Sequence, residues 1–75
     1  MTISKDISKE DKLSMVAARI RGVKVDKFNA ELNIIEQNAL EVPDESVVAS
    51  ANKTIAGATA QITALEAQYT TIQAE

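Results

Sequence analysis

The feature that most constrains this chain is a heptad pattern of apolar residues in its last third. Apolar side chains recur there at alternating steps of three and four positions. Val48, Ile55, Ile62 and Tyr69 hold the first position of the repeat, and Ala51, Ala58, Leu65 and Ile72 hold the second. A period of 3.5 residues is typical of a helix that packs along its length against another helix. The pattern predicts one long helix with these residues as its core stripe.

A second stripe of the same kind occupies the middle of the chain. Its members are Val25, Phe28, Leu32, Ile35, Ala39 and Val42, and Ile34 and Leu40 widen it into a face suited to more than one neighbour. The stripe ends where Val42 precedes Pro43, because the residue before a proline is pushed out of the helical region. Asp44 then has the character of a helix N-cap. The sequence therefore predicts a turn at Val42-Pro43 between two helices.

The first third has a shorter stripe, formed by Leu13, Val16, Ile20 and Val23. This stripe and the one that starts at Val25 are out of register by one residue. Either the helix breaks near Gly22, or it continues with a local shift of its apolar seam. We favour one continuous helix, since a single glycine is tolerated inside a helix.

These patterns predict an all-α fold, namely a long antiparallel helical hairpin with heptad stripes. We expect helices over about residues 8–41 and 44–74, preceded by a flexible tail over residues 1–7. A lone hairpin encloses no core, because each helix touches only one neighbour. We therefore expect self-association into a bundle, as a dimer or a trimer. The alternative is a monomeric three-helix bundle with a break near Gly22.

The composition excludes several classes of function. The 75 residues contain no Cys and no His, which removes disulfides, the usual zinc ligands and the usual nucleophile–base pairs. The net charge of −3 argues against nucleic-acid binding, and no apolar run is long enough to cross a membrane. The first six residues lack the apolar stretch of a signal peptide. We expect a non-enzymatic protein without cofactor or metal, in the cytoplasm in which it is made or in a virion built there.

Charged residues are better explained by structure than by chemistry. The acidic pairs Glu10-Asp11 and Asp44-Glu45 fall at predicted helix starts, where the helix dipole favours negative charge. Residues 1–27 hold seven of the eight Lys and Arg side chains, whereas residues 28–75 hold Lys53 against seven acids. The basic set lacks interleaved aromatic residues and is interrupted by acids, so a solvated and partly paired face explains it better than a polyanion site.

The predicted second helix has an unusual outer surface, rich in Ala and Thr and nearly free of charge. Either neighbouring helices shield it on several sides, or it is a smooth docking face. Gly57, between Ala56 and Ala58, suggests a close approach of another helix at that point.

Part of the chain is similar to a known group of proteins. The similarity rests on the run from Asp26 to Ala39 with its Lys-aromatic-Asn core, on the Val42-Pro43-Asp44 turn, and on the segment from Ile62 to Ala67. The chain resembles short, uncharacterised helical proteins encoded by tailed phages of marine cyanobacteria. The resemblance spans most of residues 8–75 and implies a phage origin, with no activity and no site residues attached to it.

Two functions are compatible with these observations. The first is a small structural or interaction protein that self-associates as a scaffold or assembly component. Its core and self-association stripe comprises Phe28, Leu32, Ile35, Val48, Ile55, Ala58, Ile62, Leu65, Tyr69 and Ile72. The second is a helical binding module that inhibits or redirects a host protein. Another copy of the chain, a host protein or a virion protein are the partners that these functions require.

Overall fold

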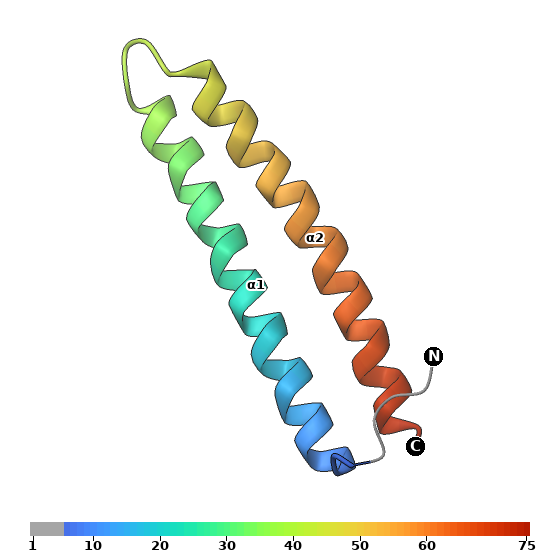
Figure 1. Ribbon diagram of the computed structural model, residues 1–75. Helices are drawn as coiled ribbons and strands as arrows, with labels where there is room; N and C mark the ends of the chain where they lie inside the picture. The colour runs from blue at the N-terminus through green and yellow to red at the C-terminus, as the bar shows by residue number, and fades with distance from the viewer. Residues whose placement is uncertain (1–5) are drawn as a thin grey trace.

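The protein is a helical hairpin made of two long helices. The computed structural model describes residues 6–75, which form α1 (Lys9–Asn38) and α2 (Glu45–Gln73) and contain no strand. The two helices run antiparallel and lie against each other along their length (Figure 1). The molecule is a rod that measures 54 × 19 × 17 Å. The prediction of an all-α hairpin is confirmed.

Each helix begins at a polar side chain that caps its first turn. At the start of α1, Oγ of Ser8 accepts a hydrogen bond from the backbone N–H of Asp11 at 3.1 Å. At the start of α2, Oδ1 of Asp44 accepts from the backbone N–H and the hydroxyl of Ser46 at 3.0 and 2.8 Å. These acceptors satisfy N–H groups that have no partner within the helix. Glu10, Asp11 and Glu45 lie in the first turns, as the helix-dipole argument predicts.

α1 is continuous through Gly22. The helix runs for 30 residues without interruption, and neither glycine has a positive φ angle. The alternative of a three-helix bundle with a break near Gly22 is therefore wrong. A single glycine costs only about 1 kcal/mol relative to alanine, which the packing of a long helix easily offsets.

The turn begins earlier than the sequence suggests, because α1 ends at Asn38 and not near residue 41. The N–H of Leu40 donates to the carbonyl of Gln37 at 3.0 Å. This bond spans three residues, as in a 3₁₀-helix, and it marks the end of the α-helix. The side chain of Gln37 then accepts from the backbone N–H of Asp44 at 2.8 Å. Gln37 thus ties the end of α1 directly to the start of α2, across a connection that includes Pro43.

The best-buried positions between the helices are mostly alanines. Among the described residues, four are almost fully buried, namely Ala30, Ala51, Ala58 and Ile72, with 2–6% of their surface exposed. Small side chains let two helix backbones come close together, so that the contact is made by methyl groups and backbone atoms. Such a core is thin, and most of the larger apolar side chains along it stay half-buried.

Candidate self-association surface

The apolar stripe of α2 faces α1 along its full length. Ala51, Ala58 and Ile72 are buried. The other members of the stripe are half-buried, namely Val48, Ile55, Ile62, Leu65 and Tyr69. The structure therefore places every α2 residue of the expected core stripe at the contact between the helices.

The side of α1 that faces α2 is the continuation of its first stripe. Extending the spacing of Leu13, Val16, Ile20 and Val23 by steps of four and three leads to Lys27, Ala30, Ile34 and Gln37. All eight positions are buried or half-buried. The seam thus runs straight through Gly22, without the break or the shift that the out-of-register stripes suggested. Sequence reasoning missed its second half because two of the four positions are polar, although the unchanged spacing is visible in the sequence.

The second apolar stripe of α1 points away from α2. Val25, Phe28 and Ile35 are 53%, 57% and 62% exposed, and Leu32 between them is half-buried. At 3.6 residues per turn, this stripe lies about 150° around α1 from the seam. Phe28 and Ile35 therefore do not belong to the packing between α1 and α2, and a role in self-association remains a prediction. We call Val25, Phe28, Leu32 and Ile35 the outer stripe.

The outer stripe continues past the end of α1 into the turn. Leu40 is 54% exposed and Val42 is 85% exposed. Scattered apolar residues are common on protein surfaces, but a row at heptad spacing along one helix face is the pattern of a surface that contacts another helix.

The outer surface of α2 is less polar than its threonines suggest. The hydroxyls of Thr59, Thr63, Thr70 and Thr71 each donate to the carbonyl four residues earlier, at 2.8–3.1 Å. This bond is common for threonine in a helix, and it directs the hydroxyl to the helix backbone. The four exposed threonines therefore use their hydroxyl hydrogens within the helix, on a helix that carries few charges.

No close approach occurs at Gly57 within the hairpin. Gly57 is exposed, and a Cβ atom added there would meet no atom within 4 Å. The same holds for Gly22. The expected contact at Gly57 is therefore not made by α1.

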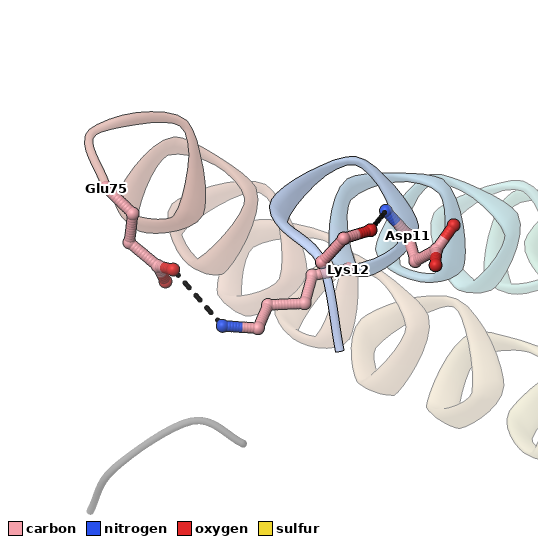
Figure 2. Close-up of polar contacts among 4 residues, drawn as sticks. Asp11, Lys12 and Glu75 are labelled. Carbon is pink, nitrogen blue, oxygen red and sulfur yellow. Dashed lines mark hydrogen bonds and ion pairs between the residues drawn. The ribbon is translucent and has the colours of Figure 1, made fainter. Parts of the chain in front are cut away.

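One ion pair closes the open end of the hairpin. Nζ of Lys12 lies 3.1 Å from Oε1 of Glu75, so the first part of α1 is joined to the residues that follow α2 (Figure 2). The Lys12 side chain is only 11% exposed, because its methylene groups pack along the helices while its ammonium group reaches the carboxylate. This contact places part of the basic start of α1 opposite the end of α2, as the antiparallel hairpin requires.

The other basic residues in the described part of the chain do not form one patch. Helical spacing puts Arg19 and Arg21 on opposite sides of α1, and Lys27 lies half-buried in the seam. The carboxylates at the helix starts are engaged with the backbone or exposed in the first turns. Within residues 6–75, no three His, Cys, Asp or Glu side chains lie together as they would to hold a metal ion.

The clefts of the molecule are open grooves between the helices. One groove is lined by Arg19, Gly22, Asp26, Gln61 and Ala64 among others.

Over the described part of the chain, no buried side-chain nitrogen or oxygen lacks a hydrogen-bond partner. No helix in that part combines the length and the apolarity needed to cross a membrane.

Comparisons with protein-family models, with curated proteins and with solved structures find no match to this chain.

Proposed function

We propose that this protein is a small structural component that works by self-association through the outer stripe of α1. The observation that supports this most directly is the exposure of Val25, Phe28 and Ile35, at heptad spacing, on a helix whose opposite side is already packed against α2. The resemblance to tailed-phage proteins suggests an assembly or virion component as its setting. No enzymatic role is part of the proposal.

Burial of this surface would favour association. Burying apolar surface contributes about 25 cal/mol per Å². Phe28 and Ile35 alone expose more than half of their surface to water. A single hairpin cannot cover them, since both of its helices already lie against each other. A partner helix laid along the outer stripe would remove them from water.

The proposal is tested by the molar mass in solution of the native chain and of a Phe28→Lys variant. Light scattering across a concentration series should show the native chain growing from monomer to dimer or trimer. Phe28→Lys should remain monomeric over the same range, because it places a charge within the proposed interface. Its helical circular dichroism should be unchanged, since Phe28 does not pack against α2.

The matched control is Ala60→Lys, which adds the same charge at an exposed position on α2. This variant should associate like the native chain. A native chain that stays monomeric at every concentration would remove self-association as the function.

A second candidate function is the docking of a host protein on the outer surface of α2. The observation that favours it is the bonding of the four exposed threonine hydroxyls within the helix, which reduces their need for water. Thr59→Lys with Thr63→Lys should then abolish binding of a purified host partner, whereas Phe28→Lys should leave it intact. The reverse result would assign that binding to the outer stripe.

A further inference from the structure

We propose that the outer stripe of α1 pairs with the same stripe of a second copy, with the two α1 helices antiparallel about a two-fold axis near residue 30. The proposal rests on the self-association proposed above and specifies its interface. A two-fold contact of this kind uses one surface patch twice and closes on itself, so it gives a discrete dimer and not an open filament.

The distribution of charge along α1 favours the antiparallel direction. From Lys9 to Lys27 the helix holds six basic and three acidic side chains. From Phe28 to Asn38 it holds Glu31 and Glu36 and no basic side chain. With the axis near residue 30, the two α1 helices overlap over about residues 22–38, and antiparallel pairing sets Lys24 of one copy level with Glu36 of the other, whereas parallel pairing sets each of these charges level with its own counterpart.

Charges that flank the outer stripe are free to serve such an interface. Lys24 precedes the centre of the stripe, and Glu31 and Glu36 follow it, all with exposed side chains. In the described part of the chain, the ion pair between Lys12 and Glu75 does not involve them. Their charges therefore remain available to a second copy.

The apolar residues match in the same arrangement. With the axis near residue 30, Val25 of one copy lies level with Ile35 of the other, and Phe28 lies level with Leu32. Each level of the contact then joins a larger side chain with a smaller one. Because the outer stripe lies about 150° from the seam, the four helices form nearly a row and not a square bundle.

The pairing is tested by chemical cross-linking of single-cysteine variants, since the natural sequence contains no cysteine. Asn29 and Glu36 are one heptad apart on the same flank of the outer stripe, and both are exposed. Near the proposed axis, the two copies of residue 29 lie about 3 Å apart along the helix direction, whereas the two copies of residue 36 are separated by about 18 Å. A short bis-maleimide reagent should therefore join Asn29→Cys to itself and leave Glu36→Cys as single chains.

A mixture of two variants extends the test. Gly22→Cys and Glu36→Cys should each fail to cross-link alone and should cross-link to each other when mixed, because antiparallel pairing places residue 22 of one copy near residue 36 of the other. Ala60→Cys, on the exposed surface of α2, is the control and should not cross-link.

Each other outcome overturns the pairing. Efficient self-cross-linking of both Asn29→Cys and Glu36→Cys would show parallel helices. Cross-linking of Ala60→Cys alone would move the contact to α2. The parallel outcome would leave the proposed self-association through the outer stripe intact, whereas the α2 outcome would keep self-association but remove the outer stripe as its surface. A native chain that is monomeric by light scattering, with no cross-linking at any position, would overturn the pairing and the proposed function together.

Discussion

Single residues set the distance between the two helices and the apolar character of the seam. Ala30, Ala51 and Ala58 are nearly fully buried and allow a close approach. Lys27 and Gln37 occupy seam positions that apolar residues usually hold. The polar side chain of Gln37 at this position is explained by the hydrogen bond that it accepts from the backbone N–H of Asp44. Lys27 weakens the seam locally, since its ammonium group must reach water past the neighbouring side chains.

Gly57→Ala should stabilise the hairpin by about 0.5–1 kcal/mol. Alanine lowers the conformational entropy lost on folding, and the added Cβ atom meets nothing within 4 Å. Chemical denaturation followed by circular dichroism measures the change. Ala58→Leu is the contrasting variant, because Ala58 is only 6% exposed and a larger side chain there should destabilise the protein. Destabilisation by Gly57→Ala would indicate that a further helix contacts Gly57 in the assembled protein.

At the scale of elements, the capping side chains set where each helix begins. Ser8 and Asp44 cap the two starts with side-chain acceptors. Two hydrogen bonds from Ser46 hold the pKa of Asp44 below its ordinary value of 3.8. The bond from the Ser46 hydroxyl has the larger effect, and the bond from the Ser46 backbone N–H has the next largest. A lowered pKa means that the ionised carboxylate is favoured by the folded state.

Asp44→Ala should lower the melting temperature at neutral pH, because it leaves the first N–H groups of α2 without their acceptor. The difference from the native chain should be complete above pH 3.8 and should disappear as the pH falls through the lower pKa of the folded state. Thermal unfolding of both proteins between pH 2 and pH 7 checks this. A difference that is independent of pH would show that the charge of Asp44 does not contribute.

At the scale of the whole molecule, the hairpin has one packed seam and one exposed stripe, and the two should respond differently to the same substitution. Ile62→Asp places a charge in the seam between the helices, where Ile62 is half-buried. Val25→Asp places the same charge on the outer stripe, where Val25 is 53% exposed.

Ile62→Asp should destabilise the fold by on the order of 3 kcal/mol, a large share of the stability of a small domain. Val25→Asp should leave the helical signal intact and reduce only the molar mass in solution. Circular dichroism and light scattering on both variants separate the two effects. Unfolding by Val25→Asp would mean that the outer stripe is needed for the hairpin itself, so that folding and association are one step.

Much of this architecture follows from the amino-acid sequence alone. The heptad of residues 48–72 determined the length of α2 and the side that it presents to α1. Pro43 and Asp44 determined where the second helix starts, because proline restricts its predecessor and aspartate caps a helix. The continuity of α1 was favoured from the tolerance of a helix for a single glycine, and the structure excluded the break near Gly22. These properties are local, so periodicity and backbone preferences are enough to predict them.

Only the tertiary structure decided which stripe of α1 is packed. Residues 25–37 carry two candidate rows, one through Phe28 and Leu32 and one through Ala30 and Ile34, and the first is the more apolar. The second faces α2 because a continuous helix keeps one face toward its partner, and Leu13, Val16 and Ile20 had already set that face. Turning the seam by about 150° within a few residues would break the helix. The more apolar stripe is thereby left exposed, and that exposure is the basis of the proposed self-association.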